Sequence, residues 1–115
     1  MGDRLPEGRD EFARYYNAAV DIPSPAISRI EEISKENDVF LVVGVIERDQ
    51  GTLYCTAIFV DPAHGLVGKH RKLTPTAMER VIWGQGDAST LTVVNKNFGS
   101  SDNRVNAKLT ATICW

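Results

Sequence analysis

The 115-residue chain has few of the side chains that mark disulfide-rich or metal-binding proteins. It contains only two cysteines and two histidines. Two cysteines cannot form the disulfide framework of a small secreted domain. The histidines, His64 and His70, have no cysteine or aspartate at the spacing of a zinc or iron site. We therefore expect free thiols, a cytoplasmic location, no bound metal and no cofactor.

Long apolar runs and an excess of one charge are also missing. The longest apolar run, residues 39–46, has eight residues, whereas a membrane-spanning helix needs roughly 20. The formal net charge is -2, with no basic excess to bind nucleic acid. The first ten residues are polar and charged, unlike a signal peptide. The pair Gly84 and Gly86 follows no strand of a βαβ unit and lacks a third glycine, so it is not a dinucleotide fingerprint. We expect neither a membrane nor a nucleic-acid partner.

The remaining composition, 43% apolar and 24% charged, is that of one globular α/β domain or part of one. Apolar spacing and turn residues predict two helices, about five strands and one short helical insertion. The predicted helices cover residues 11–20 and 25–37, the insertion 76–82, and the strands 39–46, 52–60, 66–73, 91–94 and 107–113. Residues 95–106 are predicted to form a loop.

The second helix has the clearest start and stop signals. Ser24 suits the N-cap, and Pro25 suits the first helical position, where its missing N–H costs nothing. Asn37 can adopt a left-handed conformation and end the helix.

The strand at residues 39–46 is continuously apolar, which is typical of a strand covered on both faces. Helices can cover one face, but the chain offers little for the other. Alternation along residues 66–73 places His70 and Lys72 on one face of the third strand, and Lys69 and Arg71 on the other.

Cys114 lies at the end of the last predicted strand, where α/β proteins often place chemistry. Taken alone, it fits a buried structural cysteine better than a nucleophile. Lys72 could favour its thiolate and stabilise an oxyanion, but it also fits a solvated lysine. Glu79 fits an ordinary helix former, and Glu47 fits a surface charge at a strand end. Cys55 fits the core.

Several stretches together resemble the nitrilase branch of the carbon–nitrogen hydrolase superfamily. They are residues 41–49 (LVVGVIERD), 51–57 (GTLYCTA), 68–80 (GKHRKLTPTAMER), 83–87 (WGQGD) and 113–115 (ICW). The resemblance implies a partial α-β-β-α sandwich, a single partial domain over residues 1–115, and homo-oligomers of the longer parent protein. It also implies a small-molecule nitrile substrate.

That family uses a Glu-Lys-Cys triad. By resemblance, Lys72 is the triad lysine, Cys114 is the nucleophile, and Glu79 is a second glutamate that positions the lysine and substrate. In that family, the glutamate that acts as the catalytic base follows Phe-Pro in a motif that this sequence lacks. Glu7, in Leu5-Pro6-Glu7, is not that base because no apolar strand precedes it. We therefore expect the 115-residue chain to be inactive alone.

Two alternative interpretations remain. The amidase and carbamoylase branches share the triad, but Cys114-Trp115 and residues 83–87 favour a nitrilase. The chain could also be a non-catalytic remnant that acts as an interaction module through unpaired apolar strands.

Overall fold

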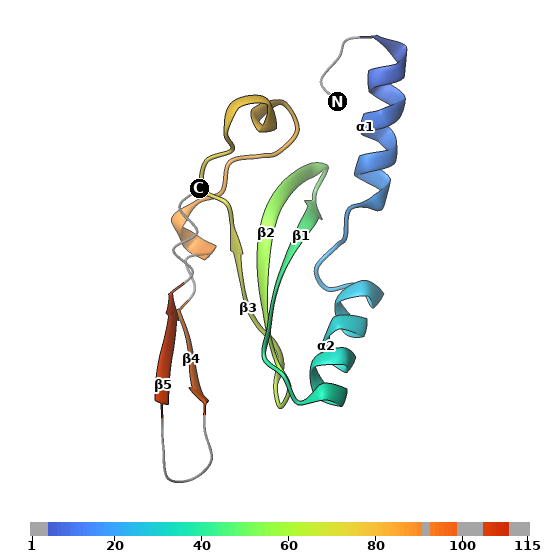
Figure 1. The fold of residues 1–115 in the computed structure, drawn as a ribbon. Coiled ribbons are helices and arrows are strands. Elements are labelled where there is room, and N and C mark those ends of the chain that lie inside the picture. The colour runs from blue at the N-terminus through green and yellow to red at the C-terminus, as the bar shows by residue number, and fades with distance from the viewer. Residues whose placement is uncertain (1–4, 91–92, 99–104, 111–115) are drawn as a thin grey trace.

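The computed structural model describes residues 5–90, 93–98 and 105–110, which form two helices, two short 3-10 helices and five strands (Figure 1). In chain order these are α1 (Pro6–Ala18), α2 (Pro25–Asn37), β1 (Leu41–Asp49), β2 (Thr52–Asp61), β3 (Gly65–Arg71), η1 (Ala77–Val81), η2 (Ala88–Thr90), β4 (Val93–Phe98) and β5 (Val105–Thr110). The predicted partial α/β fold is confirmed.

The first helix starts earlier and ends sooner than predicted. Pro6 occupies its N-terminal turn, where the missing N–H of proline is tolerated. Val20, predicted to be helical, instead pairs in parallel with Glu47 at the edge of β1. The Val20 N–H donates to the Ile46 carbonyl at 2.9 Å, and the Arg48 N–H donates to the Val20 carbonyl at 2.8 Å. Pairing with the sheet therefore overrides the local helical pattern.

The second helix begins as predicted, with Ser24 at the N-cap position and Pro25 as its first residue. The Ser24 hydroxyl makes no capping hydrogen bond. The left-handed residue at the other end is Asp38 (φ 50°, ψ 45°) and not Asn37. Asn37 stays helical, and its side-chain amide donates to the Ile33 carbonyl at 2.9 Å.

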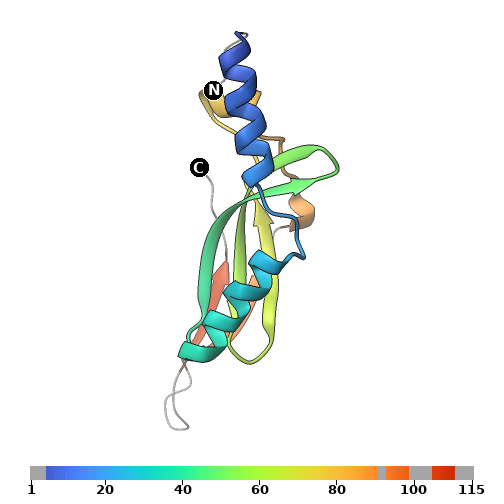
Figure 2. The ribbon, with the colours of Figure 1, turned by 90° about the vertical axis from the view of Figure 1, so that its right-hand side faces the viewer.

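Strands β1, β2 and β3 form an antiparallel meander in that order. α2 packs across one face of this sheet (Figure 2). Ile27 of α2, together with Ile58 and Val60 of β2, forms the buried apolar core. On the opposite face, Val42 of β1 is 50% exposed, whereas Leu53 and Phe59 of β2 are each 2% exposed. The expected two-sided burial of β1 is therefore not found in the described structure.

The remaining described strands, β4 and β5, pair with each other as an antiparallel two-stranded sheet. The prediction of a loop from residue 95 onward is wrong, because β4 continues to Phe98 and β5 begins at Val105. A two-stranded ribbon is held by backbone pairing and needs no apolar run, so apolar spacing does not reveal it. Along the described part of the chain, every helix is too short or too polar to cross a membrane.

Candidate active site

Lys72 comes directly after β3 and is 5% exposed. Its backbone N–H donates to the Cys55 carbonyl of β2 at 2.8 Å, and its carbonyl accepts from the Gly86 N–H at 3.1 Å. The predicted alternation is confirmed: His70 and Lys72 line one cavity, while Lys69 and Arg71 bond to Glu47. The fold thus buries the lysine on the sheet face that α2 does not cover.

Glu79 is the ion-pair partner of Lys72. The Lys72 Nζ donates to Glu79 Oε2 at 2.6 Å. The same oxygen accepts from the Thr76 backbone N–H at 2.8 Å and from the Thr76 hydroxyl at 2.9 Å. The Lys72 hydrogen bond, followed by those from Thr76, lowers the pKa of Glu79 to about 2. Glu79 is therefore a carboxylate at neutral pH, anchored by the capping box that starts η1.

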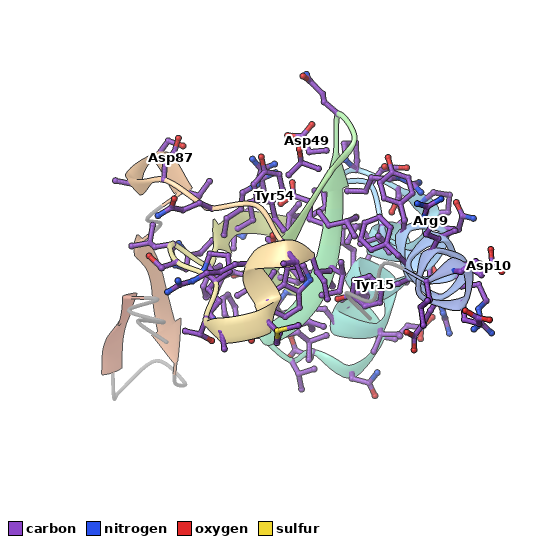
Figure 3. All side chains as sticks on the ribbon, turned by 90° about the horizontal axis from the view of Figure 1, so that it is seen from above. Arg9, Asp10, Tyr15, Asp49, Tyr54 and Asp87 are labelled. Atoms are coloured by element: carbon purple, nitrogen blue, oxygen red, sulfur yellow. The ribbon has the colours of Figure 1, made fainter. Side chains whose placement is uncertain are left out.

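The Trp83 ring lies beside the Lys72–Glu79 ion pair. Its ring centroid lies 5.8 Å from Lys72 Nζ, a cation–π contact. Its indole N–H donates to the Tyr15 hydroxyl at 2.9 Å, linking the loop after η1 to α1. Tyr15 projects from α1 toward that loop (Figure 3). Helix α1 and the loop after η1, which are distant in sequence, are thus in contact beside Lys72.

Two glycines allow the loop after Trp83 to approach the strands. A Cβ at Gly84 would lie 2.6 Å from a methyl carbon of Thr52. A Cβ at Gly86 would lie 2.7 Å from the Lys72 carbonyl oxygen and 2.9 Å from that of Arg71. Gly86 therefore permits the backbone hydrogen bond that holds Lys72 from the side opposite β2.

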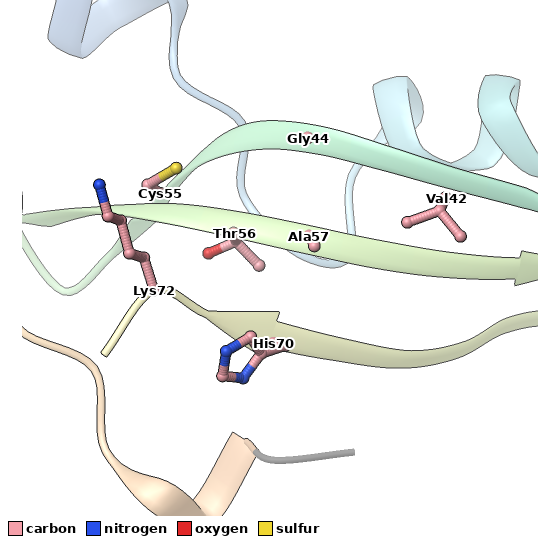
Figure 4. A pocket seen from close by; sticks show the side chains of 7 residues that line it. All are labelled: Val42, Gly44, Cys55, Thr56, Ala57, His70 and Lys72. Atoms are coloured by element: carbon pink, nitrogen blue, oxygen red, sulfur yellow. The ribbon is translucent and has the colours of Figure 1, made fainter. Parts of the chain in front are cut away.

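A cavity of about 180 Å³ lies on the same sheet face as Lys72 (Figure 4). Its lining is mostly apolar and comprises Val42, Gly44, Cys55, Thr56, Ala57, His70 and Lys72. An ammonium group beside an apolar cavity can stabilise negative charge that develops on a small bound substrate.

Cys55 lines this cavity and is half-buried, so it is not part of the apolar core cluster beneath α2. Burial raises the pKa of the Cys55 thiol, while the charge of Lys72 opposes that rise. Cys114, the predicted nucleophile, lies outside the described residues. Its position relative to Lys72 stays a prediction.

Sequence reasoning placed Glu47 at the surface, and that interpretation is wrong. Glu47 is 2% exposed and accepts hydrogen bonds from Thr56, Lys69 and Arg71. Burial, the largest single influence, raises the pKa of its carboxyl group, but the three donors together lower it to about 2. The donors come from β2 and β3, so no local pattern around Glu47 reveals them.

The two histidines differ in their exposure. His64 is exposed in the turn between β2 and β3, as predicted. His70 is buried, with Nδ1 3.1 Å from the Thr90 carbonyl oxygen. Among the residues that the structure describes, no three histidine, cysteine or carboxylate side chains gather as a possible metal site.

Comparisons of the sequence with known proteins identify one family. The carbon–nitrogen hydrolase family matches residues 5–115. An arylacetonitrilase of Trametes versicolor is 70% identical over 118 residues, which cover all of this chain and 37% of that protein. Nitrilase 2 of Arabidopsis thaliana is 49% identical over 115 residues, again over all of this chain and 32% of the relative. The chain therefore spans about a third of the length of these curated relatives.

Solved structures show the same fold. A crystal structure of an N-terminal amidase with a Gln-Gly peptide has a TM-score of 0.58 at 20% identity, covering 80% of this chain and 23% of that one. At this identity the likeness concerns the fold alone.

Proposed function

Because the chain belongs to the carbon–nitrogen hydrolase family, we propose that it forms the lysine-bearing part of the active site of a nitrilase. The observation that carries this proposal is the buried Lys72, whose ammonium is held 2.6 Å from Glu79 beside an apolar cavity. The names of the two nitrilase relatives support it. We further propose that residues 1–115 form a single partial domain of a protein with the relatives' length.

The proposed reaction proceeds through a covalent bond to Cys114. The thiolate attacks the nitrile carbon, and the nitrile nitrogen gains a proton to give a thioimidate. Water adds to that carbon, ammonia leaves, and the resulting thioester is hydrolysed by a second water to the carboxylic acid and the free thiol. The base is a glutamate from outside these 115 residues, as the family resemblance implies.

Lys72 and Glu79 have separate roles in this proposal. The Lys72 ammonium stabilises negative charge as it develops at the attacked centre. Glu79 touches the lysine and keeps its ammonium in place through the 2.6 Å hydrogen bond. The neighbouring Trp83 ring limits where the flexible lysine side chain can go.

Arylacetonitriles are the first substrates to test, because the 70% identical relative is named an arylacetonitrilase. The test uses a chimera in which these 115 residues replace the matching segment of the Trametes versicolor protein. We expect the chimera to release ammonia from phenylacetonitrile, and Cys114→Ala to abolish that release. Ser28→Ala, at an exposed position of α2, is the control and keeps activity. A folded chimera without turnover, or one that cannot assemble, contradicts the proposal.

The amidase alternative makes a different prediction for the same chimera. The amidase branch of the family remains the alternative, so phenylacetamide is assayed beside phenylacetonitrile. Faster turnover of the amide would favour that branch over a nitrilase.

We predict that the isolated 115-residue chain does not turn over nitriles. It lacks the glutamate that acts as the catalytic base in the family. In enzymes with a catalytic triad, loss of one member removes most of the rate. The measurement is ammonia release by the purified chain with a panel of nitriles. Turnover that Cys114→Ala abolishes would contradict this prediction.

Gly86→Ala is expected to impair the chimera. The new methyl group would collide with the Lys72 and Arg71 carbonyl oxygens, so the loop must move and the Gly86–Lys72 hydrogen bond is lost. We expect a destabilisation of about 1–3 kcal/mol and a lower kcat, measured by thermal unfolding and ammonia release. Gln85→Ala, at an exposed position next to it, is the control. An equal effect of both variants would argue against close packing at Gly86.

We also propose that the parent protein is a cytoplasmic homo-oligomer. The sheet face opposite α2 carries Val42 at 50% exposure, which suits cover by the rest of the protein. The interaction-module alternative would use this same face for another protein. Sedimentation of the chimera distinguishes an oligomer from a monomer, and cell fractionation of the parent tests the location.

A further inference from the structure

A buried ionic cluster lies on the sheet face opposite Lys72 and joins all three strands of the meander. Its centre is Glu47 of β1, which is 2% exposed. Glu47 accepts from the Thr56 hydroxyl of β2 at 2.8 Å. From β3 it accepts the Arg71 Nε at 2.8 Å, the Arg71 Nη2 at 2.7 Å and the Lys69 ammonium. We call these four residues the Glu47 cluster.

Arg71 is the best-fixed member of the Glu47 cluster. Besides its two bonds to Glu47, its Nη2 donates to Asp49 at 2.7 Å. Its guanidinium carbon lies 3.9 Å from the centroid of the Tyr54 ring, a cation–π contact. Asp49 and Tyr54 lie at the same end of the sheet (Figure 3). A planar guanidinium with partners on several sides has little freedom to rotate.

Lys72 is the next residue after Arg71, and successive side chains along a strand point to opposite faces. Arg71 is the register partner of Thr56, and the Lys72 N–H donates to the Cys55 carbonyl at 2.8 Å. The Glu47 cluster therefore holds the end of β3 from the sheet face opposite the Lys72 side chain. It does so at the residue directly before Lys72.

We propose that Glu47 is a positioning residue, which holds the end of β3 through Arg71 so that the Lys72 ammonium meets Glu79 and the reacting carbon. This inference rests on the proposed nitrilase function. Glu47 does not touch the substrate, because it faces the side of the sheet away from the cavity. Its effect reaches the reaction through the backbone of two adjacent residues.

A positioning role and a merely structural role predict different kinetics. Loss of a contact made only in the transition state lowers kcat and kcat/KM together and leaves KM unchanged. A structural role lowers the unfolding midpoint and the amount of folded protein, but each folded active site keeps its kcat. The decisive quantity is therefore kcat per active site.

The experiment uses the chimera with Glu47→Gln, which keeps the size of the side chain and removes its charge. Active sites are counted by alkylation of the cysteine that substrate protects, at a temperature well below both unfolding midpoints. We expect kcat per site to fall at least about 10-fold, with KM changed less than about 2-fold, since small misplacements of catalytic groups can cost up to about 100-fold. Asp21→Asn, which removes the exposed carboxylate partner of Arg48 outside the Glu47 cluster, is the control and stays within about 2-fold in kcat.

Arg71→Lys is the second variant. It keeps the positive charge but loses the fork that makes two bonds to Glu47, so kcat should again fall while KM holds. An unchanged kcat per site in Glu47→Gln, or a failure of both variants to assemble, would overturn the inference and leave a purely structural cluster. If the unsubstituted chimera itself shows no turnover, the proposed function fails instead, so the two failures are distinguishable.

Discussion

Lys72→Met in the chimera is expected to lower kcat for phenylacetonitrile by on the order of 10²- to 10³-fold, the usual effect of removing one donor from a developing negative charge. Methionine keeps the length and packing of the side chain but has no charge. Because the contact forms in the transition state, kcat and kcat/KM should fall together.

The structure predicts that this variant still folds. Glu79 is 32% exposed, so it can bond to water when Lys72 is gone, and its two hydrogen bonds from Thr76 remain. Lys35→Met, at an exposed position of α2, is the control and should change neither kcat nor the unfolding midpoint. Full activity of Lys72→Met would remove Lys72 from the mechanism.

Glu79→Gln is expected to lower kcat on the order of 10²-fold through loss of the charge that holds the Lys72 ammonium. Glutamine can still accept hydrogen bonds from Thr76, so the start of η1 is preserved. Glu36→Gln, an exposed substitution on α2, is the control. The measurement is kcat across pH.

The pH profile of Glu79→Gln separates a charge effect from a proton-transfer role. The pKa of Glu79 is lowered from 4.5 to about 2, so the group is already charged throughout the working range. Its contribution is present above the usual carboxyl pKa and is lost only as the pH falls toward 2. We therefore expect a lower plateau with an unmoved acid limb. A displaced acid limb would mean that Glu79 itself titrates during the reaction.

Local patterns predicted much of the fold around the site. The N-terminus of α2 followed from Pro25, because proline geometry is local, whereas Ser24 occupies the N-cap position without a capping hydrogen bond. The faces of Lys69, His70, Arg71 and Lys72 followed from strand alternation. Lys72 and Glu79 are in contact, and the catalytic roles that the family resemblance implies for them stay predictions.

Long-range contacts account for what the sequence did not reveal. Glu47 resembles a surface charge until β2 and β3 bring a hydroxyl and two cations to it. Val20 continues a helical pattern, yet the edge of β1 recruits it. Gly86 resembles an ordinary loop glycine, and its need for close approach appears only when Lys72 lies against it.

We propose that Lys72 serves a covalent reaction at Cys114. The most direct test is mass spectrometry of the chimera, quenched and digested during turnover of phenylacetonitrile. We expect a substrate-derived thioester or thioimidate on the peptide that contains Cys114. Because Cys55 also lines the cavity beside Lys72, an adduct on Cys55, with Cys114 unmodified, would rule out Cys114 as the nucleophile.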